Sequence, residues 1–90
     1  MTKNYLYKTH GTCSSLINIK LDDDVVTDVT YTNGCNGNLQ GIGALTRGMK
    51  LDDVIERLEG IRCGMKNTSC PDQLANALKA IKSGELLPEG

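Results

Sequence analysis

Four cysteines in this 90-residue chain each lie beside a glycine or proline turn signal rather than within an apolar stripe. A cysteine that serves only as a buried small group normally occupies an apolar position of a helix or strand. Here the thiols fall at the ends of predicted elements, where the fold can bring loops together. Four thiolates that converge form a tetrahedral cage for a metal ion. The predicted ligands are Cys13, Cys35, Cys63 and Cys70.

Zn²⁺ is the predicted metal, because it accepts four sulfur ligands in tetrahedral geometry and needs no redox partner. An iron-sulfur cluster is the alternative, since the same thiolates can bind iron. A third interpretation is dithiol chemistry, with a disulfide between Cys63 and Cys70 or between Cys35 and Cys70. Separate reduced thiols remain the alternative to a shared site. For Cys13, the alternative is a partly buried thiol at a strand end, with water or a side chain as the fourth ligand.

Two of the cysteines precede predicted helices. Cys35 lies at the entrance to one helix and Cys70 at the entrance to another, directly before Pro71. Unpaired N–H groups and the helix dipole favour negative charge there, which lowers a thiol pKa. The segment Asn33–Asn38 could also form an anion-binding nest, although a glycine-permitted turn explains it as well. His10, the single histidine, could replace a cysteine ligand or lie in solvent at a strand end.

Composition excludes several classes of function. Ten basic and eleven acidic residues give a net charge of -1, and no Lys or Arg cluster could follow a phosphate backbone, so nucleic-acid binding is disfavoured. No stretch approaches the ~20 apolar residues of a membrane span, and the N-terminal residues lack the apolar core of a signal peptide. We therefore expect a cytoplasmic protein. Disulfides are rare in that reducing compartment, which favours a metal or redox role for the cysteines.

Periodicity predicts three strands followed by three helices. Ile17, Ile19 and Leu21 alternate with polar residues, and Asp22–Asp24 turn the chain into the next strand, which indicates an antiparallel hairpin. The predicted strands cover about residues 5–9, 17–21 and 25–32, and the helices begin near residues 38, 51 and 70. This order is typical of a single α+β domain, with the three helices packed on one face of a three-stranded antiparallel sheet. The domain spans residues 1–90 with an ordered core at about 4–83, and the last residues should fray.

Side-chain spacing also predicts which residues form the core. Apolar positions at three- and four-residue steps place a stripe on the first helix, while Gly41 and Gly43 interrupt it. Each glycine costs ~1 kcal/mol relative to Ala in a helix interior, and we expect a close approach to the sheet or to another helix as compensation. On the third strand, Val25, Val29 and Tyr31 can share one face, and on the first helix the apolar stripe consists of Leu39, Ile42, Leu45 and Met49.

The segment Thr68-Ser69-Cys70-Pro71-Asp72 resembles the signature after which the TSCPD domain family is named. The resemblance extends from about Tyr5 to Lys82 and includes Gly11-Thr12-Cys13-Ser14, Gly34-Cys35-Asn36-Gly37 and Arg62-Cys63-Gly64. Asn33 stands where Gly is common in the family, a departure that affects no ligand.

Members of that family occur as small free-standing proteins and as the C-terminal part of some ribonucleotide reductases. The resemblance implies that the four cysteines form a metal site and that a ribonucleotide reductase is the partner. It also implies that a small member such as this chain can be labelled a ribonucleoside-diphosphate reductase, with nucleotide binding and DNA precursor synthesis as part of that label. Reduction of a nucleotide requires a large barrel that 90 residues cannot enclose, so we expect an accessory module without catalytic residues rather than a stand-alone enzyme. The architecture is also similar to iron-sulfur cluster scaffolds of the NifU N-terminal type. The oligomeric state stays open.

Overall fold

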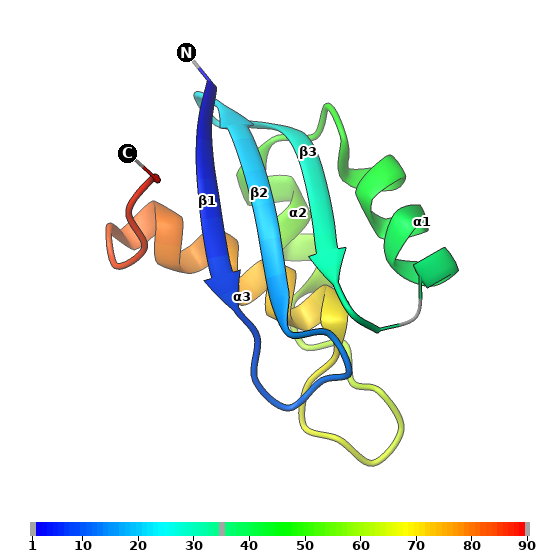
Figure 1. Cartoon of the computed structure of the whole chain (residues 1–90). Coiled ribbons are helices and arrows are strands. Elements are labelled where there is room, and N and C mark those ends of the chain that lie inside the picture. The colour runs from blue at the N-terminus through cyan, green and yellow to red at the C-terminus, as the bar shows by residue number, and fades with distance from the viewer. Residues whose placement is uncertain (1, 35, 90) are drawn as a thin grey trace.

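A computed structural model of the protein describes residues 2–34 and 36–89. The strands β1 to β3 come first and form one antiparallel sheet in the order β1-β2-β3, and the helices α1 to α3 follow (Figure 1). The predicted α+β order of three strands and three helices is therefore confirmed. The elements are β1 (Thr2–Lys8), β2 (Leu16–Asp22), β3 (Val25–Thr32), α1 (Asn36–Thr46), α2 (Leu51–Leu58) and α3 (Cys70–Ser83).

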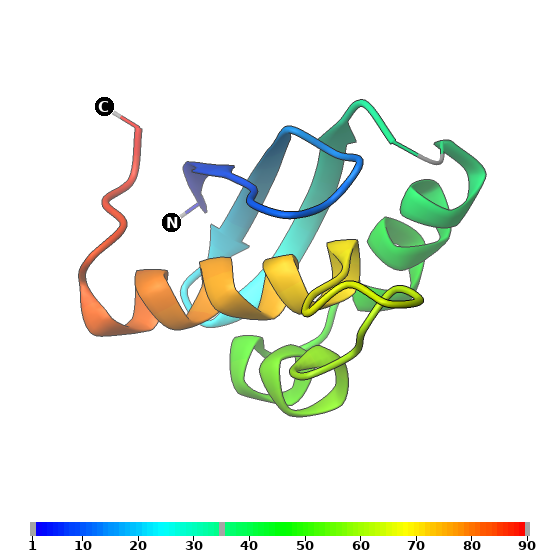
Figure 2. The ribbon, with the colours of Figure 1, turned by 90° about the horizontal axis from the view of Figure 1, so that it is seen from below.

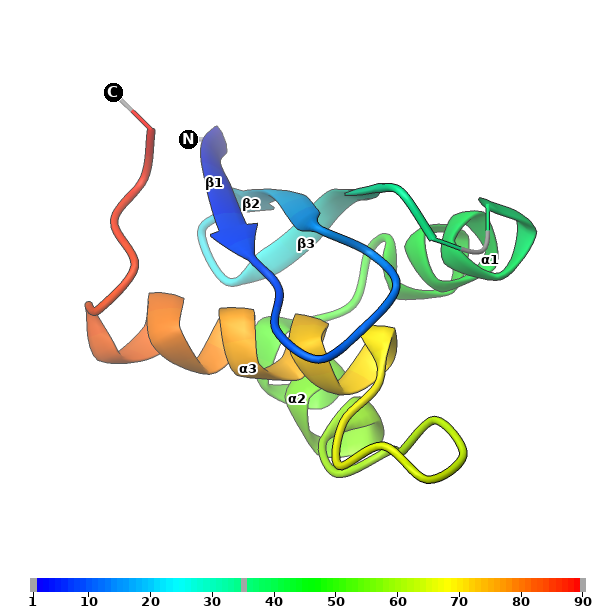
Figure 3. The ribbon, with the colours of Figure 1, turned by 60° about the horizontal axis from the view of Figure 1, so that its bottom comes forward.

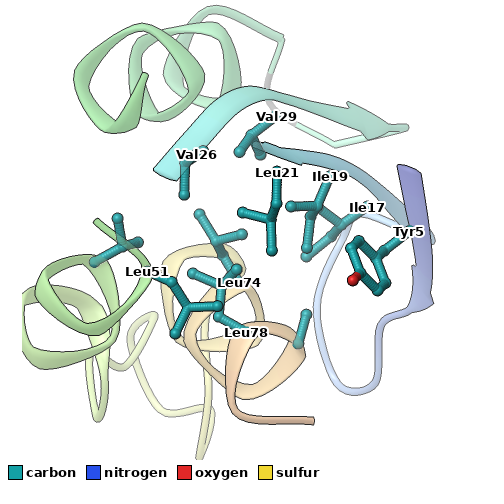
Figure 4. Packing of buried hydrophobic residues seen from close by; sticks show 11 residues of the cluster. Tyr5, Ile17, Ile19, Leu21, Val26, Val29, Leu51, Leu74 and Leu78 are labelled. Carbon is teal, nitrogen blue, oxygen red and sulfur yellow. The ribbon is translucent and has the colours of Figure 1, made fainter. Parts of the chain in front are cut away.

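One face of the sheet carries the core. Along β2, Ile17, Ile19 and Leu21 are buried as predicted, because alternate side chains of a strand point to the same face. The neighbouring strands follow the same register, with Tyr5 of β1 opposite Ile19 and Val29 of β3 opposite Ile19 on the other side. This cross-strand row gives the sheet one continuous apolar surface (Figure 4).

A bulge in β3 changes which valine enters the core. Lys20 pairs with Asp28, but Leu21 pairs with Val26, so β3 contains one extra residue at this point. That residue is Thr27, whose hydroxyl donates a hydrogen bond of 3.0 Å to the Lys20 carbonyl. Because a shift of one residue moves side chains to the opposite face, Val26 is fully buried. The prediction that Val25 shares the face of Val29 was wrong, since Val26 is buried beside Val29 and Val25 is only partly buried.

Helices α2 and α3 cover the apolar face of the sheet. Figures 2 and 3 show α3 running beneath the strands, with α2 beside it on the same side. Leu51 and Val54 of α2 and Leu74 and Leu78 of α3 are buried in the same cluster as the strand residues (Figure 4). The predicted starts of both helices, near residues 51 and 70, are also confirmed. Gly84, in the left-handed conformation with φ of 86°, ends α3.

Helix α1 lies alongside β3 and packs through a glycine (Figure 1). A Cβ built on Gly43 would lie 2.6 Å from the Val29 carbonyl oxygen, so only glycine permits this approach. The expected compensation for the helix glycines is thus confirmed at Gly43. At Gly41, by contrast, a Cβ would meet nothing within 4 Å. Leu45 was expected in the core but is 79 % exposed, because the helix turns that residue away from the sheet.

The segment after α3 returns to the sheet. Its Leu86 packs against the core, and the Leu86 N–H donates a hydrogen bond of 3.0 Å to the Ala80 carbonyl. Further on, the Glu89 N–H donates a hydrogen bond of 2.7 Å to the Asn4 carbonyl at the outer edge of β1. These contacts differ from the expectation that the segment frays. They bring the first strand and the last described residues side by side (Figure 1).

Candidate cysteine site

Three of the four predicted metal ligands lie around one small pocket. The connection between β1 and β2 and the loop that precedes α3 lie side by side below the sheet (Figures 1 and 3). Cys13 comes from the first segment, Cys63 from the second and Cys70 from the start of α3, and all three line a pocket of about 20 Å³. Cys35 lies outside the described residues. Three of the four predicted ligands therefore line the same pocket, while metal binding by them stays a prediction.

Cys70 is the buried member of this group. It is the first residue of α3 and only 8 % exposed, whereas Cys13 and Cys63 are exposed. Its carbonyl oxygen accepts a hydrogen bond of 3.1 Å from the Tyr31 hydroxyl of β3. Its sulfur lies 3.1 Å from the Ser14 hydroxyl oxygen. The thiol is thus held between the sheet and the connection that follows β1.

Hydrogen-bond donors around Cys70 determine its ionisation. Burial raises the pKa of the Cys70 thiol, but donors from the neighbouring turn outweigh burial and leave the pKa below its ordinary value. These donors are the Ser14 side chain and backbone, the Thr12 hydroxyl and the Cys13 thiol. The pKa of Tyr31 is raised, first by burial and second by the negative charge of Cys70. The turn therefore stabilises Cys70 as a thiolate.

Glycine at position 34 allows the end of β3 to approach Cys13. A Cβ built on Gly34 would lie 3.3 Å from the Cys13 sulfur, 3.3 Å from the Ser14 nitrogen and 2.9 Å from a Leu39 methyl group. Gly34 also has a backbone φ of 97°, a conformation that residues with a side chain rarely adopt. Gly34 thus lies against the cysteine site from the β3 side.

The loop before α3 is closed by its own backbone. The Cys63 N–H donates a hydrogen bond of 3.1 Å to the Thr68 carbonyl, and the Cys63 carbonyl accepts one of 3.0 Å from the Lys66 N–H. These hydrogen bonds hold Cys63 where the loop closes, near the start of α3. This closure explains how a cysteine seven positions before Cys70 reaches the same pocket.

Ser69 and Asp72 join the start of α3 to the end of α2. Ser69 caps α3, because its hydroxyl oxygen accepts a hydrogen bond of 3.1 Å from the Asp72 N–H and its hydroxyl donates one of 2.6 Å to the Ile61 carbonyl. The Asp72 carboxylate accepts hydrogen bonds from the Gly60 N–H, at 2.7 Å, and from the Thr68 hydroxyl. Asp72 lies in the first turn of α3, where its negative charge complements the helix dipole, and its carboxylate also fastens this loop.

Each of residues 68–72 thus has its own structural role. Thr68 contributes a hydroxyl, Ser69 the helix cap, Cys70 a buried thiol, Pro71 a proline in the first turn and Asp72 a carboxylate. A model of the TSCPD domain family matches residues 2–82 of the chain. The chain belongs to the TSCPD domain family. No curated protein and no solved structure matches it. Among the described residues of this TSCPD domain, no helix is long and apolar enough to cross a bilayer.

Gln73 connects the TSCPD signature to the turn after β1. Its side-chain oxygen accepts a hydrogen bond of 2.9 Å from the His10 backbone N–H, and its side-chain nitrogen donates one of 3.0 Å to the Thr68 hydroxyl. A Cβ on Gly11 would lie 3.2 Å from the Thr68 methyl group, so glycine permits this contact. The His10 side chain is exposed and does not line the pocket of the cysteines. Gln73 was missed because a helix-face glutamine carries no distinctive sequence signal.

The three described thiols share a pocket without forming a complete metal cage. Within residues 2–34 and 36–89, no group of three or more His, Cys, Asp or Glu side chains is placed to hold a metal ion. The metal site of this TSCPD domain therefore stays a prediction. What the arrangement provides is a buried thiol at Cys70 whose pKa is lowered by hydrogen bonds, with the exposed thiols of Cys13 and Cys63 at the rim of the same pocket.

Replacing Ser14 by alanine is expected to raise the pKa of Cys70, because the thiolate loses its hydroxyl donor. The Cβ NMR chemical shift of Cys70, followed against pH in zinc-free reduced protein, measures this pKa. A thiol pKa lowered by folding also makes stability rise with pH, with the gain complete above the unfolded value of about 8.5 and lost as pH falls through the folded value. Ser15→Ala is the control, because Ser15 is exposed and bonds to Thr32. Equal titration curves for both variants would contradict the assignment.

Proposed function

We propose that this TSCPD domain is a metal-binding module in which Cys13, Cys35, Cys63 and Cys70 hold one Zn²⁺. The observation that carries the proposal is the shared pocket of about 20 Å³ lined by Cys13, Cys63 and Cys70. A pocket of this size suits a single small ion or water rather than an organic cofactor, since one water needs about 10–15 Å³. The donor set is also that of a structural zinc site.

Ionisation of the thiols supports this proposal. A cysteine must be deprotonated to bind zinc, and the pKa of Cys70 is lowered by the hydrogen bonds that outweigh its burial. Cys35 is included because it follows Gly34 in the chain, and a Cβ on Gly34 would lie 3.3 Å from the Cys13 sulfur. When bound, Zn²⁺ neutralises neighbouring thiolates and links loops that are distant in sequence.

A site with four cysteine ligands would serve structure rather than catalysis. Four protein ligands leave no open position for a substrate or for an activated water. The core of this chain contains no Phe and no Trp, so a bound metal would add stability that a light aliphatic core lacks. We therefore propose an accessory role, and the family resemblance names a ribonucleotide reductase as the proposed partner.

Metal analysis of the full chain tests the proposal. Protein purified under reducing conditions without a metal-affinity column is expected to contain about one zinc per chain. Cys70→Ser is expected to lose most of this zinc, whereas Met65→Ser, a change of an exposed residue in the same loop, should retain it. Folded wild-type protein without metal, in which four thiols titrate freely, would contradict the proposal.

An iron-sulfur or redox carrier is the second candidate. The exposure of Cys13 and Cys63 at the rim of the pocket favours it, because exposed thiols can accept or release a cluster. This function predicts visible absorption in protein purified without oxygen. A colourless product with one zinc per chain would support the zinc module instead.

A further inference from the structure

An open apolar groove lies between α1 and the loop that precedes α3. Its volume is about 580 Å³. Gly37, Gly41 and Leu45 line it from α1, and Ile61 and Arg62 line it from the loop. Leu45 is 79 % exposed and Ile61 42 % exposed. The groove therefore presents large apolar side chains to solvent next to the cysteine site.

The outer face of α1 has features that the fold of one chain does not require. A Cβ built on Gly37 or Gly41 would meet nothing within 4 Å, in contrast to Gly43, which packs against β3. Glycine in a helix interior lowers helix stability, so Gly41 brings no gain within the chain. The helix Asn36–Thr46 also contains no Asp, Glu, Lys or Arg. An uncharged surface helix with an exposed leucine is typical of an interface.

The spacing of this face is complementary to itself. Gly37, Gly41 and Leu45 follow one another at four-residue steps, so they share one side of the helix. If two copies of α1 pack antiparallel around a two-fold axis at Gly41, Leu45 of each copy lies over Gly37 of the other. The Leu45 side chain of each copy then fills the open space beside Gly37 of the other copy, and Gly41 allows the two helix backbones to approach each other. Since the helix carries no charge, the symmetric contact brings no like charges together.

We propose that the groove binds α1 of a second copy of this chain. The face of an 11-residue helix measures only roughly 16 Å by 10 Å, well below the ~800 Å² per partner of a standard interface, so the opposite wall of the groove must contribute. That wall includes Cys13 and Cys63, which also line the groove. The second copy therefore covers thiols that are exposed in the single chain. This inference does not depend on the identity of a bound metal.

Sedimentation equilibrium of the full chain tests the dimer. At concentrations up to about 0.5 mM, chosen because a small interface binds weakly, the wild type is expected to reach twice the 9.7 kDa of one chain. Gly41→Glu and Leu45→Glu are expected to remain monomeric, because the first places a charge opposite its symmetry mate and the second buries a charge against Gly37 of the other copy. Both positions are open, so circular dichroism should show folded variants. Gln40→Glu is the control, since it adds the same charge to an exposed position on the side of α1 toward β3.

The outcomes separate this proposal from the zinc site. A monomeric wild type at the highest concentration, or a dimer that persists in both Gly41→Glu and Leu45→Glu, would overturn it. Binding of a different protein to this face by a monomeric chain would likewise show that the occupant is not a second copy. Zinc content is measured on the same samples, so a dimer without zinc would contradict only the metal site, and a zinc-loaded monomer only the dimer.

Discussion

Replacing Asp72 by alanine is expected to lower the free energy of unfolding by about 3 kcal/mol. Its carboxylate, in a residue only 9 % exposed, accepts hydrogen bonds from the Gly60 N–H and from the Thr68 hydroxyl. Hydrogen bonds to charged groups contribute about 1.5–3 kcal/mol each, and a donor left buried without a partner adds a desolvation cost. The loop that carries Cys63 would lose its attachment to α3. Urea unfolding, with the midpoint and slope compared, measures the loss.

Asp53→Ala is the matched control for this prediction. Asp53 is also an acidic residue in the first turn of a helix, but it is exposed, so its removal should change stability by less than about 0.5 kcal/mol. A second readout comes from Tyr7, whose pKa is raised first by burial and second by the charge of Asp72. In Asp72→Asn the pKa of Tyr7 should fall, because the negative charge is gone. Equal stability of the two alanine variants would refute the fastening role of Asp72.

Two glycine substitutions in α1 are expected to change stability in opposite directions. Gly43→Ala would place a Cβ 2.6 Å from the Val29 carbonyl oxygen, and the shift of backbone needed to relieve this contact should cost about 2 kcal/mol. Gly41→Ala meets no atom within 4 Å, and it should stabilise the protein by up to about 1 kcal/mol through helix propensity. Thermal and urea unfolding of both variants measure the two effects.

The comparison is made at one low protein concentration, so that association through α1 does not contribute to the measured stability. Because both variants make the same chemical change in the same helix, they differ only in what surrounds the new methyl group. Destabilisation of similar size in both would mean that α1 does not pack against β3 through Gly43.

Most of the fold follows from local patterns. The alternation of Ile17, Ile19 and Leu21 predicted β2, and Ser69, Pro71 and Gly84 marked both ends of α3, because caps act within a few residues. The bulge beside Leu21 could not be predicted, since it depends on pairing between strands rather than on the sequence of one strand. The exposure of Leu45 was missed for a similar reason: periodicity shows that a stripe exists but not where the covering surface ends.

The candidate site was predictable in outline but not in detail. Turn signals beside the cysteines indicated convergence, and the structure brings Cys13, Cys63 and Cys70 to one pocket. The role of Ser14 in ionising Cys70 was not foreseen, because the hydrogen bond joins residues 56 positions apart. The fastening of Thr68 to Asp72 had a local signal in retrospect, since a hydroxyl and a carboxylate four residues apart can meet at the start of a helix.

The distance in sequence between Ser14 and Cys70 also bears on biosynthesis. The sheet needs only the first 32 residues, and neighbouring strands can pair while the ribosome is still translating the rest. Cys13 can contact α3 only later, because Cys70 at the start of α3 is synthesised 57 residues after Cys13. The pocket that Cys13 shares with Cys63 and Cys70 is therefore completed only late in translation, after the sheet has been made.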